Sequence, residues 1–190
     1  MALSKIDIEN MITGEVNVAN GGTGLSSGTS GQFLKFTGST TLASAADNAG
    51  KVLQIVQAQK DGVISTSSTS YVTTQLSANI TPSATGSKVL ILANMTACLQ
   101  AAQNKNGYFT IYRASTNIAP GGSGVYQQLS GIYTSNGGSI TPGLNMSFLD
   151  SPSTTSETTY TVYMATDSSG DQRMNQNGTS SVIQLLEIGA

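Results

Sequence analysis

Apolar and polar residues alternate with a period of two through most of residues 51–190, the pattern of strands with one buried face. In the segment 71–80, for example, Val72, Leu76 and Ile80 share one face, and Tyr71 and Gln75 share the other. Pairs typical of turns, such as Asp-Gly, Asn-Gly and Pro-Gly, separate the alternating segments. The pattern predicts eight strands, at residues 52–60, 71–80, 88–99, 107–114, 125–133, 144–149, 159–166 and 181–188.

Eight short strands in about 140 residues predict an all-β fold, a β-sandwich of the jelly-roll kind. A seven-stranded immunoglobulin-like sandwich is the rival, but the chain contains no Trp and one Cys, so it lacks the usual Trp and Cys pair. Residues 88–93 (Lys-Val-Leu-Ile-Leu-Ala) form the most apolar segment and are predicted to be a central strand. Their continuous apolar run indicates burial on both faces, either between two sheets or at a subunit contact.

The first fifty residues follow a different pattern. Residues 14–50 are dense in Gly, Ser and Thr and carry short apolar pieces at 16–18, 33–36 and 41–43. Glycines interrupt any helix, and pieces this short cannot bury a core within one copy. We therefore divide the chain into a docking arm (1–13), a stalk or linker that pairs with identical chains (14–50) and a β-sandwich (51–190).

The arm contains five apolar residues within its first twelve positions: Leu3, Ile6, Ile8, Met11 and Ile12. A weak capping-box pattern favours a short helix, whereas the alternation at residues 6–9 favours an extended arm. Twelve residues hold neither shape alone, so the segment needs a partner surface. We predict that these five side chains dock onto another protein.

Composition excludes several classes of function. Only 9% of residues are charged and the net charge is −2, so there is no basic footprint for nucleic acid. The chain has no His and a single Cys, so we expect no Cys–His or Ser–His nucleophile, no metal and no cofactor. It also shows no signal peptide and no run of apolar residues that would span a membrane. We expect synthesis in a cytoplasm and no membrane insertion.

Several motifs invite chemical interpretations that their surroundings do not favour. Asp150 and Glu157 are two carboxylates, as in a glycosidase pair, but they flank a Ser/Thr/Pro loop that suggests no buried site. Asp167 and Asp171 flank a turn, with too few carboxylates for calcium. The Gly-rich runs at 21–24 and 121–124 lack the Lys of a phosphate-binding loop. Cys98 lies in an apolar strand and is interpreted as a buried small apolar residue.

Two tyrosines are the candidates for surface contact. Tyr126 and Tyr133 lie in a region poor in charge, among Gln and Asn residues. Tyrosine beside amide side chains is a common surface for stacking on sugars or packing on proteins. The alternative is that each is either a half-buried strand residue or a contact between subunits. We favour this alternative over binding of sugars or other proteins.

Two segments resemble virion proteins of tailed bacteriophages. Residues 18–42 contain the Gly-Gly-Thr-Gly run that recurs in tail fibres and other appendages, here at 21–24. The segments Ile-Thr-Pro-Ser (80–83), Ser-Lys-Val-Leu-Ile (87–91), Gly-Tyr-Phe-Thr-Ile-Tyr-Arg (107–113) and Thr-Tyr-Thr-Val (159–162) occur in the order of a β-domain from such phages. The resemblance covers most of residues 17–189.

This resemblance implies a non-enzymatic virion protein, a short homotrimeric tail fibre attached by its N-terminus and displaying a β-sandwich. Its partners would be its own copies, other virion proteins, and a glycan or protein of the host surface. The chain is short for a long fibre, which leaves a capsid decoration or head-fibre protein as an alternative. A carbohydrate-binding module or depolymerase is the alternative from another class.

Overall fold

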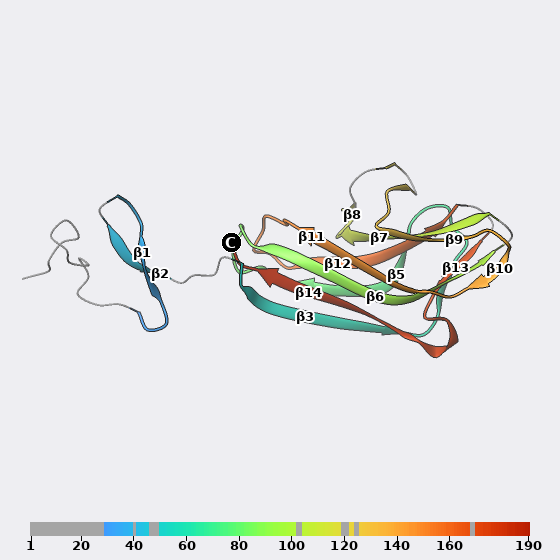
Figure 1. Cartoon of the computed structure of the whole chain (residues 1–190), viewed down its shortest axis with the longest axis horizontal. Coiled ribbons are helices and arrows are strands. Elements are labelled where there is room, and N and C mark those ends of the chain that lie inside the picture. Colours follow the sequence, from blue (N-terminus) through green and yellow to red (C-terminus); the bar gives the residue numbers. More distant parts are fainter. Residues whose placement is uncertain are drawn as a thin grey trace, which may run out of the picture. The chain divides into compact units, whose positions relative to one another are not determined.

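The computed structural model describes residues 29–39, 41–45, 50–101, 104–118, 122–123, 126–167 and 170–190. The chain forms two compact units, Met1–Asn48 and Ala49–Ala190, and each is considered by itself (Figure 1). The predicted docking residues, Leu3, Ile6, Ile8, Met11 and Ile12, lie outside the described residues.

The described part of the smaller unit is a two-stranded antiparallel hairpin. Its strands are β1 (Phe33–Phe36) and β2 (Leu42–Ala45), which pair from Phe33 with Ala45 to Phe36 with Leu42. All four residues of β1 are exposed among the described residues of this unit. A two-stranded hairpin is marginally stable in water by itself.

The larger unit contains twelve strands and one short 3₁₀ segment, η3, in its described residues. They are β3 (Val52–Asp61), β4 (Ile64–Thr66), β5 (Val72–Ile80), β6 (Lys88–Ala101), β7 (Lys105–Arg113), β8 (Thr116–Asn117), β9 (Ser130–Thr134), β10 (Gly138–Ile140), β11 (Gly143–Asp150), β12 (Thr158–Thr166), β13 (Asp171–Met174), η3 (Gln176–Gly178) and β14 (Ser180–Ile188).

The eight main strands pair as a jelly roll. One sheet has the order β3-β14-β6-β11, called sheet I here, and the other has the order β5-β12-β7-β9, called sheet II. All these pairs are antiparallel. Numbered along the chain, the orders are 1-8-3-6 and 2-7-4-5, which is a long hairpin rolled into two facing Greek keys. The predicted all-β jelly-roll sandwich is confirmed.

The smaller strands extend sheet I beyond a common bend. β10 continues the register of β11 along β6, and the interruption falls at Pro142, which has no N–H to donate. β13 also pairs with β6, and β4 pairs with β13, but their register is shifted from that of β14 and β3 by the residues inserted between β13 and β14. At this bend Asn175 is fully buried with a φ of 62°, and its Nδ2 donates to the carbonyl oxygens of Lys60 and Gly62.

The core lies between the two sheets and is built by the alternation seen in the sequence. Val89, Ile91 and Ala93 of β6 face Leu76 and Ile111 across it, and all five are at most 1% exposed. The prediction that residues 88–93 form a central strand is confirmed, because β6 lies between β14 and β11.

One predicted strand is partly wrong. Residues 126–129 do not extend β9 but form a loop that lies over the outer side of sheet II. Tyr126 N–H donates to the Ser123 carbonyl in a turn, and the Gln127 carbonyl accepts from Tyr71 Oη and Asn117 Nδ2. Leu129 N–H still donates to the Phe109 carbonyl of β7, but residues 126–128 bond through a turn and through side chains, which alternation alone does not reveal.

Candidate functional site: the outer faces of the two sheets

An aliphatic row crosses the whole outer face of sheet I. Ile55 of β3 pairs with Leu186 of β14, Leu186 pairs with Leu90 of β6, and Leu90 pairs with Leu149 of β11. Their neighbours along the strands, such as Val89, Ile91 and Leu185, are buried in the core. Because successive side chains of a strand point to opposite faces, the four residues of the row point away from the core.

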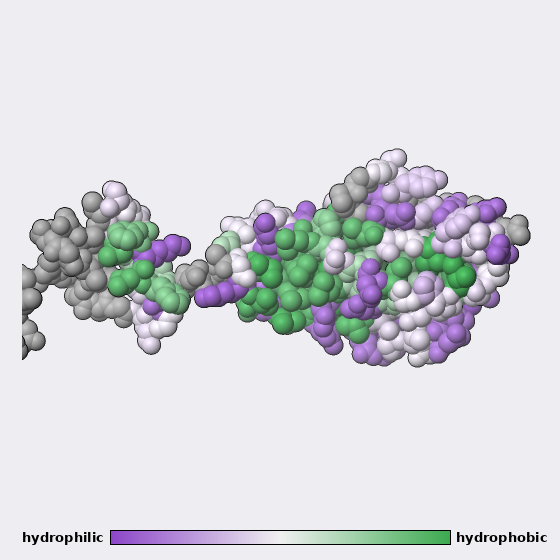
Figure 2. Space-filling model, in the orientation of Figure 1, coloured by the Kyte–Doolittle hydropathy of each residue, from purple (hydrophilic) through white to green (hydrophobic). Residues whose placement is uncertain are grey.

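The row is open to solvent in a single copy. Ile55 is 63% exposed and Leu149 is 49% exposed, at the two edges of the sheet. Leu90 and Leu186, between them, are partly exposed. On the same face, Val52 at the start of β3 pairs with Ile188 at the end of β14 and adds to the apolar surface near the C-terminus. In Figure 2 the hydrophobic surface of the larger unit gathers over β3, β14, β6 and β11 near the end that carries the C-terminus.

Most of the rest of that face carries uncharged polar side chains, although Lys88 of β6 pairs with Ile188 beside the aliphatic row. The next row along the strands contains Gln57, Gln184, Leu92 and Ser147, and the row after it contains Gln59, Val182, Asn94 and Asn145. Gln184 Nε2 donates to Gln57 Oε1 at 2.8 Å. An apolar strip beside neutral amides is typical of a protein interface, whose core is depleted in charged side chains.

A buried carboxylate lies beneath the aliphatic row. Glu187 is 1% exposed and accepts hydrogen bonds from Gln54 Nε2 (2.6 Å), Ser83 N (2.7 Å) and Ser83 Oγ (2.6 Å). Burial by itself raises the pKa of Glu187, but the hydrogen bonds from Ser83 and Gln54 outweigh it and lower the pKa to about 2. The carboxylate thereby fastens the segment after β5 to the edge of sheet I.

Asp150 joins the two sheets. Its carboxylate, on β11, accepts hydrogen bonds from Arg113 Nη1 at 3.0 and 2.9 Å and from Tyr160 Oη at 2.7 Å. Burial, then the hydrogen bond to Asp150, raises the pKa of Tyr160. Asp150 is 7% exposed, whereas Glu157 is exposed, so both oxygens of Asp150 serve a structural ion pair.

The other motifs noted in the sequence also have structural surroundings. Asp167 Oδ2 accepts from Asn106 N and Nδ2, and Asp171 forms an ion pair with Arg173. Among the described residues, no three His, Cys, Asp or Glu side chains gather as a metal site. Cys98 is a buried free thiol near Ser139, as expected. No helix in the described part of the chain has the length and apolar character of a membrane span.

The outer face of sheet II is aromatic and polar instead of aliphatic. Tyr112 and Tyr163 stack with their ring centroids 4.0 Å apart, and Tyr71 meets Tyr112 edge to face. Burial, then the neighbouring Tyr163, raises the pKa of Tyr112. Thr110 Oγ1, on the same face, donates to Asn117 Oδ1. Hydroxyl and amide groups on this face therefore bond to one another.

The two candidate tyrosines lie at one end of this face. Tyr126 is 66% exposed and lies in the loop, so it is not a half-buried strand residue, whereas Tyr133 is 54% exposed within β9. Their expected role as contacts between subunits stays a prediction. Tyr126 packs edge to face on Tyr108 at 5.8 Å, in the loop described above. A cleft of about 280 Å³ opens beside them, lined by Asn106, Gly107, Tyr108, Gln128, Gly131, Ile132 and Tyr133.

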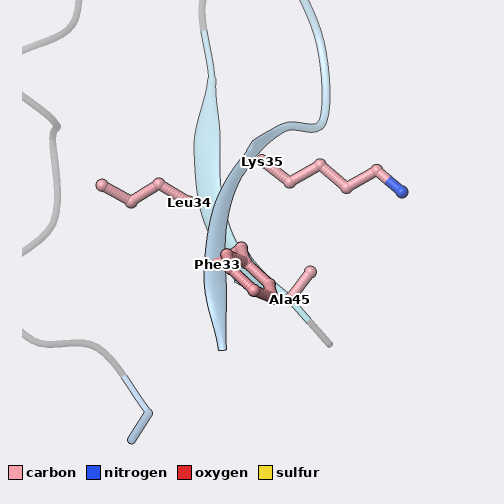
Figure 3. A pocket seen from close by; sticks show the side chains of 4 residues that line it. All are labelled: Phe33, Leu34, Lys35 and Ala45. Atoms are coloured by element: carbon pink, nitrogen blue, oxygen red, sulfur yellow. The ribbon is translucent and has the colours of Figure 1, made fainter. Parts of the chain in front are cut away.

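The hairpin of the smaller unit offers a further apolar surface. Phe33, Leu34 and Phe36 are 57–64% exposed, and a shallow hollow of about 290 Å³ is lined by Phe33, Leu34, Lys35 and Ala45. Figure 3 shows Leu34 projecting to the side opposite Lys35, with Phe33 beside Ala45. Both faces of the hairpin therefore present apolar side chains.

Comparison with known proteins does not assign the chain to a family. No protein-family model and no curated protein match the chain. Solved structures similar to it include the infectious bursal disease virus Gx strain and the VP2 subviral particle of the same virus, each at 14% identity and a TM-score of 0.36. The matches cover 82% of this chain and 41–42% of those chains, so the chain spans less than half their length.

Proposed function

We propose that the chain is a structural protein of a tailed-phage virion, a short trimeric fibre held to the particle by its N-terminal arm. The observation that carries the proposal is the aliphatic row of sheet I, Ile55, Leu186, Leu90 and Leu149, left open to water in one copy. Contiguous apolar surface of this kind marks an interaction site in soluble proteins. The sequence resemblance supplies the virion setting and the trimer.

Two surfaces support association with identical chains. The aliphatic row belongs to the jelly roll, and the hairpin with Phe33, Leu34 and Phe36 belongs to the smaller unit. A hairpin that is apolar on both faces needs further strands or copies for stability. Because charges are scarce, apolar burial and main-chain pairing would supply the binding energy.

The mass of the full-length protein in solution tests the trimer. Light scattering should give three times the 19.5 kDa of one chain. Ile55→Glu, which places a charge in the row, should lower the mass toward that of a monomer. Asn79→Glu is the matched control, because Asn79 is an exposed polar residue of β5 on the outer face of sheet II, and this variant should remain trimeric. A wild-type monomer, or equal effects of the two variants, would contradict the proposal.

The arm is tested on the particle. Deletion of residues 1–13 should abolish incorporation into virions while the jelly roll stays folded by circular dichroism. Incorporation of the truncated protein into virions at the normal copy number would contradict the docking role of the arm. Counting copies per particle also separates the two virion positions, since tens or fewer indicate a fibre and hundreds indicate a capsid decoration protein.

A further inference from the structure

The cleft at the end of sheet II is built on two paired strands. Asn106 of β7 pairs with Tyr133 of β9, and Tyr108 of β7 pairs with Gly131 of β9. Gly131 has no side chain, which leaves room between Tyr133 and Gln128. A Cβ at Gly131 would lie 3.0 Å from Gln128 Oε1 and 3.1 Å from the Gly107 carbonyl oxygen, so a larger residue there would crowd the lining of the cleft.

Two lining side chains are held in place by hydrogen bonds. Tyr133 Oη donates to Asn104 Oδ1 at 2.7 Å, which fixes the orientation of an exposed ring. Asn106 donates from both its backbone N and its Nδ2 to Asp167 Oδ2, at 3.0 and 2.8 Å. A ligand would therefore meet an aromatic face and an amide that are already ordered, which lowers the entropic cost of binding.

The third lining group is incompletely bonded. Gln128 Oε1 is buried and has no hydrogen-bond partner within the described residues. A buried acceptor without a donor costs about 1–3 kcal/mol, so rotation of the Gln128 side chain toward a ligand hydroxyl in the cleft would be favoured. The seven lining residues include no charged side chain, so the cleft offers no attraction to a charged ligand.

We propose that this cleft binds one neutral hexose unit of a glycan, with the sugar ring stacked on Tyr133 and its hydroxyls bonded to Gln128 and Asn106. An aromatic face, neutral amides and a volume of about 280 Å³ suit a small, uncharged ligand rich in hydroxyls. This inference deepens the proposed role in host-surface contact by naming the class of ligand and the residues that hold it.

Direct binding to sugars tests the inference on the full-length chain. Saturation-transfer NMR and calorimetry with glucose, galactose, mannose and N-acetylglucosamine should show saturable binding of at least one, in the millimolar range. Tyr133→Ala should weaken that binding about tenfold or more. Tyr163→Ala removes a tyrosine from the same sheet face outside the cleft and should bind as the wild type does.

Gln128→Leu separates ligand binding from a structural role. The substitution keeps the approximate shape and removes an unsatisfied oxygen, so thermal stability should stay the same or rise while sugar affinity falls about tenfold. Binding of none of the four sugars overturns the inference, as does unchanged binding by Tyr133→Ala. Light scattering on the same samples keeps the two proposals apart, because a trimer without sugar binding refutes only the cleft.

Discussion

The outer faces of the two sheets differ although both sheets alternate in the same way and share one core. Sheet I presents the aliphatic row from Ile55 to Leu149, whereas sheet II presents stacked tyrosines, threonines and amides. The loop at 126–129 bonds to sheet II, and within the described residues the two ends of the row on sheet I, Ile55 and Leu149, are about half exposed or more. This difference is the basis of our proposals that sheet I contacts identical chains and that sheet II binds a ligand.

The largest effect is expected from making sheet I resemble sheet II. The triple substitution Ile55→Thr, Leu149→Thr and Leu186→Thr places β-branched, strand-forming side chains at all three positions but removes much of the apolar row. It should raise the dissociation constant of the trimer about a thousandfold, about 4 kcal/mol, as measured by sedimentation equilibrium. An unchanged dissociation constant would show that sheet I is not the subunit contact.

A smaller effect is expected where the two sheets are joined. Asp150→Ala leaves Arg113 and the buried Tyr160 hydroxyl without their carboxylate, which should lower the free energy of unfolding by about 3 kcal/mol. Tyr160→Phe removes a single hydrogen bond and should cost about 1 kcal/mol. Urea denaturation measures both, and equal losses from the two variants would argue against a shared network.

The free energy of unfolding should depend on pH through Glu187, which lies at the edge of sheet I beside the aliphatic row. Its pKa is lowered in the folded protein to about 2, so the carboxylate stabilises the fold above its ordinary pKa. That stabilisation should be lost as the pH falls from about 4.5 toward 2. Glu187→Gln should cost about 2 kcal/mol at neutral pH and should remove this part of the pH dependence.

The measurement for Glu187 is the difference between two proteins. The urea midpoints of the wild type and of Glu187→Gln are measured at neutral and at acid pH. The difference between the two midpoints at each pH cancels the contribution of the other carboxylates. The difference in urea midpoint between the wild type and Glu187→Gln should become smaller as the pH is lowered. A gap that stays constant with pH would show that the charge of Glu187 does not stabilise the fold.

The smallest effect is expected on the face of sheet II. Tyr163→Ala removes the stack on Tyr112 and should cost about 1 kcal/mol in the free energy of unfolding. Its mass by light scattering should not change, in contrast to substitutions in the aliphatic row. A shift toward the monomer would assign sheet II to the subunit contact as well.

The alternation of residue types was sufficient to predict the strands and the class of fold. Seven of the eight predicted segments match main strands closely, because each has one face buried in the core. The short strands β4, β8, β10 and β13 were missed, since two to four residues are too few to show a period. The loop at 126–129 was missed because its apolar and polar residues imitate a strand.

The candidate surfaces were only partly visible in the sequence. Tyr126 and Tyr133 were singled out by their amide neighbours, but Gly131 and Asn106 were not, since the cleft forms only when β7 pairs with β9. The continuous apolar run at 88–93 indicated a subunit contact as one of two alternatives. Its inner half proved to be core and its outer half part of the exposed face.

The sequence by itself determined which residues form strands and which of their faces avoid water, because burial selects side chains locally with a period of two. Only the tertiary structure decided which strands became neighbours. Ile55, Leu90, Leu149 and Leu186 are separated by up to 131 positions, and they form one row because the jelly roll sets their registers. Register depends on long-range pairing and turn geometry, which no single segment of the chain encodes.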